Sequence, residues 1–162
     1  MRIGEVAIIS HNTTATEDFI KSICGKIEIK NRAICFGRFE VDEQLALHLY
    51  GIVVDKENKS FFWDIASRKM MAYIFIFDWD DKNLLETIKP VIDHFSQNSD
   101  APMIVVANIP DKSDPPIPVR FFQPNGIPLS TNARFTFGQI TDSEDARKVM
   151  VLLVNMLIEL IS

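Results

Sequence analysis

The sequence predicts an α/β protein with a doubly wound, mostly parallel six-stranded sheet and one antiparallel hairpin. Apolar runs alternate with amphipathic runs along the whole chain, as they do in strand–helix–strand units. Two apolar runs, residues 71–78 and 102–107, are nearly continuous, which is typical of central strands covered on both faces. Residues 32–50 contain two strand-like runs around the polar pair Asp42-Glu43, and this pattern predicts the hairpin.

The elements follow one another without a linker or a repeat, so residues 1–162 are expected to form one domain. Gly25 ends the first helical run. Pro90 is expected to kink a later helix or to mark a break in it, and Asp142 is expected to be the N-cap of the last helix. The expected strands are residues 3–9, 32–41, 44–50, 71–78, 102–107 and 127–132. The expected helices are residues 16–24, 58–69, 81–97 and 142–161, and the proline-rich residues 115–125 are expected to form an extended loop.

Composition narrows the class of partner. The net charge is −5 and no dense Lys or Arg patch occurs, which disfavours nucleic acid because phosphate neutralisation needs a basic face. The longest apolar run, residues 149–161, is interrupted by Asn155 and Glu159 and is too short to span a bilayer.

Cys24 and Cys35 lack metal-ligand spacing and are interpreted as buried apolar side chains. With no secretory leader, the chain is expected in the cytoplasm.

The turn after the first strand, residues 10–17 (SHNTTATE), lies where a phosphate-binding loop would lie. In nucleotide-binding α/β domains this junction reads G-x-x-x-x-G-K-[ST], with N–H groups and a lysine around the phosphates. Here Ser10 and Ala15 hold the glycine positions. Thr16 holds the lysine position, and Glu17 holds the position of the Mg²⁺ ligand.

The same turn still carries groups that bind anions. His11, Asn12, Thr13 and Thr14 place hydroxyl and N–H donors at the start of a helix, and a helix N-terminus attracts anions without any lysine. Thr13, Thr14 and Thr16 are therefore the candidate phosphate contacts of a degenerate loop. Such contacts predict weak phosphate binding and no hydrolysis, and the residues indicate neither a catalytic group nor a metal ligand.

Two later segments stand where a guanine base would bind. Asn108 and Asp111 follow a predicted strand with N-x-x-D spacing. In that arrangement the aspartate accepts hydrogen bonds from N1–H and N2–H₂ of guanine, and the asparagine anchors the loop. The alternative is a pair that only caps the loop, because Asn and Asp are common after any strand. Ala133 lies in residues 131–134, which are expected to follow the last strand and to form a third base-binding loop.

Together these segments resemble the small Ras-like GTP-binding proteins of bacteria. Within them the chain is most similar to the group encoded beside Roadblock-type regulators, whose typical pattern runs "DFGRI…L.LFGTPGQERFWFMWD". The resemblance covers nearly the whole chain, and it implies a P-loop small-GTPase fold, GTP or GDP as ligand, and a protein partner of the Roadblock or longin type. The segments that carry it are FGRFEVDEQLALHLYG (36–51), SFFWD (60–64), MIVVANIPD (103–111) and IPLSTNAR (127–134).

The departures from this family fall on its phosphate-binding positions. The family's G-T-P-G-Q loop, which senses the γ-phosphate, matches residues 51–55. Val54 therefore replaces a glycine, and Asp55 replaces the water-orienting glutamine and adds negative charge. Lys30 begins a segment in which the family usually has threonines. Each lost charge-assisted contact is worth about 1.5–3 kcal/mol, so losing several would weaken nucleotide binding by orders of magnitude.

The leading hypothesis is a pseudo-GTPase, a signalling or scaffold protein that acts through protein–protein binding with little or no GTP hydrolysis. The alternative is a divergent GTP-binding protein with weak nucleotide binding. A receiver-like module is a third reading, disfavoured because Ile9-Ser10 and Gly51-Ile52 occupy the places of the acidic residues that it needs. Aromatic residues at this density are candidate interface anchors, although core packing is the favoured reading for each: Phe61, Phe62, Trp63, Trp79, Phe121, Phe122, Phe135 and Phe137.

Overall fold

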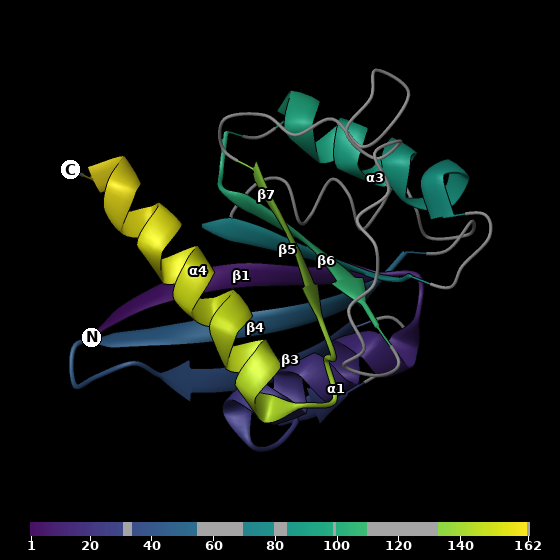
Figure 1. Cartoon of the computed structure of the whole chain (residues 1–162). Coiled ribbons are helices and arrows are strands. Elements are labelled where there is room, and N and C mark those ends of the chain that lie inside the picture. Colours follow the sequence, from purple (N-terminus) through teal and green to yellow (C-terminus); the bar gives the residue numbers. More distant parts are fainter. Residues whose placement is uncertain (31–33, 55–69, 80–83, 99, 110–132, 162) are drawn as a thin grey trace.

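The computed structural model describes residues 1–30, 34–54, 70–79, 84–98, 100–109 and 133–161. Within them the chain forms one seven-stranded sheet and three helices (Figure 1). The strands are β1 (Arg2–Ser10), β2 (Ile29–Lys30), β3 (Ile34–Glu40), β4 (Leu45–Val53), β5 (Ala72–Asp78), β6 (Met103–Asn108) and β7 (Ala133–Gly138). The helices are α1 (Thr13–Cys24), α3 (Leu84–Asn98) and α4 (Ser143–Ile161).

The strand order is β2-β3-β4-β1-β5-β6-β7. β4, β1, β5, β6 and β7 run parallel to one another, and β2 and β3 form the antiparallel edge. The predicted mostly parallel α/β sheet and its β3–β4 hairpin are therefore confirmed. Within the described residues the sheet has seven strands, and two of them were not predicted: β2, which pairs with β3, and β7, which begins after the predicted strand 127–132.

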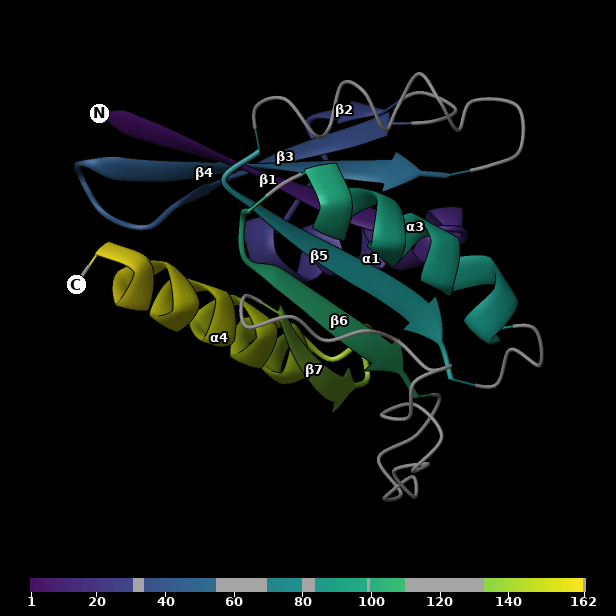
Figure 2. The same ribbon diagram turned by 90° about the horizontal axis from the view of Figure 1, so that it is seen from above.

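Helices cover both faces of the sheet, α3 on one side and α1 with α4 on the other (Figure 2). On the α3 side, Phe95 packs against Tyr73 and Phe75 with ring centroids 4.8 and 5.5 Å apart. On the other side, Phe19 and Ile20 of α1 and Leu153 of α4 are fully buried. These two layers bury β5 from Ala72 to Phe77 on both faces, which explains its continuous apolar sequence.

Helix α1 approaches the sheet closely because two strand residues lack a side chain. A Cβ atom on Gly37 would lie 2.6 Å from Cγ2 of Ile20, and a Cβ atom on Gly51 would lie 3.0 Å from Cδ1 of the same isoleucine. Gly25 ends α1 in the left-handed region at φ 81°, and its N–H bonds to the Lys21 carbonyl. A glycine adopts this conformation without steric cost.

Most of the other predicted elements are confirmed. The Asp42 carboxylate accepts hydrogen bonds from the amides of Gln44 and Leu45 and so closes the hairpin turn. Asp142 caps α4 by accepting from the Glu144 amide at 2.8 Å, and Pro90 lies inside α3. The predicted helix 58–69, the loop 115–125 and the strand 127–132 lie outside the described residues.

Candidate functional site

The topology marks one end of the sheet as the place where a ligand would bind. β1 and β5 are neighbours, but the chain leaves β1 through α1 on one face and leaves β5 toward α3 on the other. In doubly wound sheets the crevice at the carboxyl ends of two such strands is the usual ligand site. In this protein that end carries Ser10, Asp78 and Asn108, the last residues of β1, β5 and β6. We call it the carboxyl end of the sheet.

The Asp78 carboxylate joins two of the connections at this end. Its Oδ1 accepts a hydrogen bond of 3.2 Å from the side-chain amide of Asn108, and its Oδ2 accepts one of 3.3 Å from that of Asn12. Asn12 is also the N-cap of α1, because its Oδ1 accepts from the Thr14 amide at 2.9 Å. A carboxylate therefore lies beside the N-terminus of α1, where it opposes the attraction of this helix end for another anion.

Asn108 connects β6 to the segment after β7. Its Oδ1 accepts a hydrogen bond of 3.1 Å from the amide of Ile140, and its backbone carbonyl accepts from the Trp79 amide at 3.0 Å. Next along the chain, the Ile109 amide donates to the Gly138 carbonyl at 3.0 Å. Asn108 is therefore a loop anchor, the role predicted for it under both the base-binding and the loop-capping reading.

The connection between β1 and α1 is shorter than the sequence pattern suggested. β1 ends at Ser10 and α1 begins at Thr13, so only His11 and Asn12 lie between them. Thr13 and Thr14 form the first turn of the helix, and Thr14 is exposed. The predicted helix start at residue 16 was three residues too late. Residues 13–17 of the phosphate-loop pattern are inside α1, where the backbone N–H groups beyond the first turn bond within the helix.

Thr16 does not face solvent. Its side chain is 1% exposed, and its Cβ would lie 3.0 Å from a Cβ atom placed on Gly51. The Thr16 hydroxyl also hydrogen-bonds the buried thiol of Cys35, whose pKa is raised by burial. Thr16 therefore packs between α1 and the sheet, and it is not available to a phosphate outside the protein.

The backbone N–H at the γ-phosphate position is already bonded. Val54 directly follows β4 and is buried. Its amide donates a hydrogen bond of 3.0 Å to the Ser10 carbonyl at the end of β1. In the family that the chain resembles, a glycine N–H at this position would meet the γ-phosphate. Asp55, the neighbouring acidic residue, lies outside the described residues.

Glu17, which stands at the Mg²⁺-ligand position of the phosphate-loop pattern, forms an ion pair. The Lys30 Nζ lies 2.9 Å from its Oε1, with the lysine side chain exposed and the glutamate mostly buried. This hydrogen bond and the glutamate charge raise the pKa of Lys30. The pair links α1 to β2, and the lysine charge compensates the Glu17 carboxylate.

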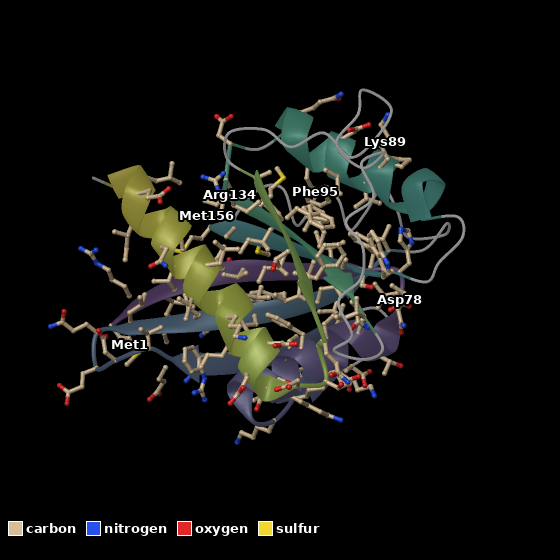
Figure 3. The ribbon with its side chains drawn as sticks, viewed as in Figure 1. Met1, Asp78, Lys89, Phe95, Arg134 and Met156 are labelled. Atoms are coloured by element: carbon tan, nitrogen blue, oxygen red, sulfur yellow. The ribbon has the colours of Figure 1, made fainter. Side chains whose placement is uncertain are left out.

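Ala133 lies far from Asn108 along the sheet. It begins β7 and pairs with Met103, the first residue of β6, whereas Asn108 pairs with Gly138. Five residues of strand, about 16 Å, separate the two ends. Figure 3 shows the next residue, Arg134, well away from Asp78. The prediction that Ala133 follows the last strand was therefore wrong, because the strand begins where we expected it to end. Asp111 lies outside the described residues.

The residues that sequence reasoning missed are Asp78 and the segment from Gly138 to Ile140. Asp78 ends an apolar strand, and nothing in its local sequence marks it as a site residue. The N-cap Asp142 could have revealed the second segment. The loop that follows the last strand must end where the last helix begins, and Asp142 marks that point. Within this loop the Gln139 amide donates to the Asp145 carboxylate at 2.8 Å.

The aromatic residues near this end form part of the core. Trp79 packs edge-on against Phe137 at 4.9 Å, and Phe137 packs against Phe135 at 5.1 Å. All three are partly buried against the cluster on the α3 side. Core packing therefore accounts for them, and the other aromatic candidates, at positions 61–63 and 121–122, lie outside the described residues.

In the described part of the chain, no group of three or more His, Cys, Asp or Glu side chains could hold a metal ion. Over the same residues, none of the helices combines the length and the apolar character needed to cross a membrane. Comparison with models of known protein families, and with curated protein sequences, found no match to this chain.

Proposed function

We propose that this protein is a pseudo-GTPase, a Ras-like α/β domain that acts by binding another protein and does not hydrolyse GTP. The observation that carries the proposal is the two-residue connection between β1 and α1. A phosphate loop surrounds the phosphates with successive backbone N–H groups, and His11 and Asn12 alone are too short a connection to do so.

The charges at the carboxyl end of the sheet support the same proposal. Asp78 places a carboxylate beside the Asn12 cap, and the Glu17 carboxylate is paired with Lys30. A nucleoside triphosphate carries about four negative charges, which active sites of this kind offset with a lysine, Mg²⁺ and converging N–H groups. In this chain the lysine position is the buried Thr16, and the Val54 N–H is bonded to Ser10.

The proposal predicts that the purified protein neither binds GTP tightly nor turns it over. The test is equilibrium binding of GTP with and without Mg²⁺, followed by measurement of phosphate release. A sub-micromolar dissociation constant together with Mg²⁺-dependent turnover would contradict the proposal. The Roadblock or longin-type partner that the resemblance implies is tested by co-elution with a purified dimer of that type, and we expect a complex that forms without nucleotide.

A second candidate function is weak guanine-nucleotide binding, and Asn108 favours it. Its side chain is fixed by Asp78 and by the Ile140 amide at the crevice where a doubly wound sheet binds ligands. This candidate requires that GTP and GDP, but not ATP, raise the melting temperature. It also requires that Asp111→Ala abolish this shift, because discrimination between the bases would depend on that carboxylate.

A further inference from the structure

A groove of about 950 Å³ lies at the end of the sheet opposite Asp78. Its walls are the start of β1, the turn between β3 and β4, Met71, and the last turns of α4. In Figures 1 and 2 the chain termini and this turn lie at one end of the molecule. Figure 3 places Met1 there and Asp78 at the other end. We call this groove the amino-end groove.

Exposed apolar side chains gather in this groove. Met1 is 72% exposed, Ile3 56% and Ile158 53%, and Val41 and Met71 are also exposed. These five residues line the groove, and they are five of the eight large apolar side chains that are exposed in the described residues. Contiguous apolar surface of this kind marks an interaction site more often than scattered exposed residues do.

The sequence of α4 independently indicates that this part of the helix is covered. From Val149 to Leu160 its polar residues are Asn155 and Glu159 alone. Leu153 faces the core and is fully buried, whereas Ile158 is exposed and lines the groove. A helix that is apolar on opposite faces is normally buried on both, so the groove side of α4 is expected to contact a partner.

The charges around the groove define the chemistry of that partner. Asp42 and Glu43 line the groove, and among its described lining residues the cations are Arg2 and the α-amino group of Met1. Glu40 and Glu159, both exposed, stand next to lining residues in the sequence. A basic segment would meet favourable potential here, and an acidic one would be repelled. A second copy of this chain would bring the same acidic rim against itself.

We propose that the amino-end groove binds an amphipathic helix of another protein, one whose apolar face is flanked by Lys or Arg. Leu, Ile or Phe side chains of that helix would fill the groove, as in other helix-in-groove complexes. Met1 and Met71 are suited to such a surface because methionine side chains adapt to differently shaped partners. This inference rests on the proposed protein-binding function and specifies where the binding occurs.

The test uses two synthetic 18-residue peptides with leucine at helical spacing, one carrying lysine and the other glutamate at the remaining positions. The protein is labelled at its methionine methyl groups and followed by NMR during titration. We expect the Met1 and Met71 signals to shift with the lysine peptide, while Met103, buried in the core on the α3 side, does not. The glutamate peptide should bind at least tenfold more weakly at low salt, and added salt should reduce this difference.

Paired variants distinguish binding in the amino-end groove from non-specific binding elsewhere on the surface. Ile3→Ser should weaken binding of the lysine peptide about tenfold, the cost of losing one buried aliphatic contact. Val151→Ser, an exposed residue of α4 that is not among the lining residues, should leave binding unchanged. Glu43→Lys should remove the preference for the lysine peptide, whereas Glu28→Lys, near the β2 edge, should keep it.

Equal affinity for the two peptides, or equal loss in Ile3→Ser and Val151→Ser, would overturn the inference. A dimer in sedimentation experiments that Ile3→Ser dissociates would overturn it as well, because a second copy would then be the occupant. These failures leave the pseudo-GTPase proposal intact. Stabilisation by GTP would refute that proposal whatever the peptides do.

Discussion

The Val54 amide donates a hydrogen bond of 3.0 Å to the carbonyl oxygen of Ser10. This bond continues the parallel pairing of β1 and β4 by one residue beyond Val53, the last residue paired with β1. In the family that the chain resembles, the backbone at these two positions faces the phosphates. Here the two backbones bond to each other, so under the pseudo-GTPase proposal the Val54 N–H is not available to a γ-phosphate.

The lysine of the phosphate-loop pattern cannot be restored at Thr16. We expect Thr16→Lys to lower the free energy of unfolding by more than about 2 kcal/mol, because the side chain is fully enclosed and a buried unpaired ammonium is costly. Thr14→Lys, at an exposed position of the same helix, is the control and should change it by less than about 0.5 kcal/mol. Urea denaturation measures both. A stable Thr16→Lys variant that binds GTP would contradict the placement of this residue.

Gly51 is predicted to be intolerant of a side chain. A Cβ atom there would lie 2.5 Å from Cys35 Sγ, so Gly51→Ala should cost about 1–3 kcal/mol of stability through overpacking. Cys35→Ala in the same chain should recover part of this loss, since it removes the clashing sulfur. At Gly138 the nearest atom to such a Cβ is 3.7 Å away, and Gly138→Ala should be close to neutral. Thermal unfolding of these three variants and the unmodified protein gives the comparison, and equal effects at the two glycines would refute the prediction.

Asn108 is predicted to contribute to stability whether or not a nucleotide binds. Asn108→Ala removes the acceptor for the Ile140 amide and a donor to Asp78, and a part-buried group left without its partner costs about 1–3 kcal/mol. Asn155→Ala, at an exposed position of α4, should cost little because alanine favours a helix. If both variants unfold at the same urea concentration, Asn108 is not the anchor that its contacts indicate.

Cys24 is predicted to react slowly with thiol reagents in the folded protein. Burial, with a smaller effect from the charge of Glu28, raises the pKa of its thiol from 9.0 to about 11. At pH 8 this reduces the thiolate fraction about 100-fold, and alkylation by iodoacetamide should slow accordingly, since the thiolate is the nucleophile. Because the folded-state pKa is the higher one, the linked stability is present below pH 9 and is lost as pH rises toward 11. Rapid alkylation at pH 8 would contradict this prediction.

The strands could be predicted from the sequence because their signals are local. The apolar run from Ala72 to Phe77 and the alternation in β4 depend on burial, which the residue types themselves report. The helix caps Gly25 and Asp142 were equally clear, since both residue types favour these positions for conformational reasons.

The site was harder to predict because it depends on contacts between distant residues. Asp78 meets Asn12 and Asn108 only once β1, β5 and β6 are aligned. Matching the chain to a phosphate-loop pattern also assumed a loop of fixed length, whereas Thr13 and Thr14 continue the helix toward β1. The same pattern matching placed Ala133 after the last strand. In the structure Ala133 is the first residue of β7 and pairs with Met103.

The most direct test of the central claim is the melting temperature with GTP, GDP or ATP at 1 mM, each with and without Mg²⁺. A nucleotide that binds with a dissociation constant of about 10 μM would stabilise the protein by about 2.7 kcal/mol at this concentration. For a chain of this length, that gain would raise the melting temperature by at least about 5 °C. We predict a change in melting temperature smaller than about 1 °C for every nucleotide. The groups at the positions that match phosphate contacts already bond within the protein, so little nucleotide should bind. A rise of several degrees with GTP and GDP but not with ATP would contradict the pseudo-GTPase account.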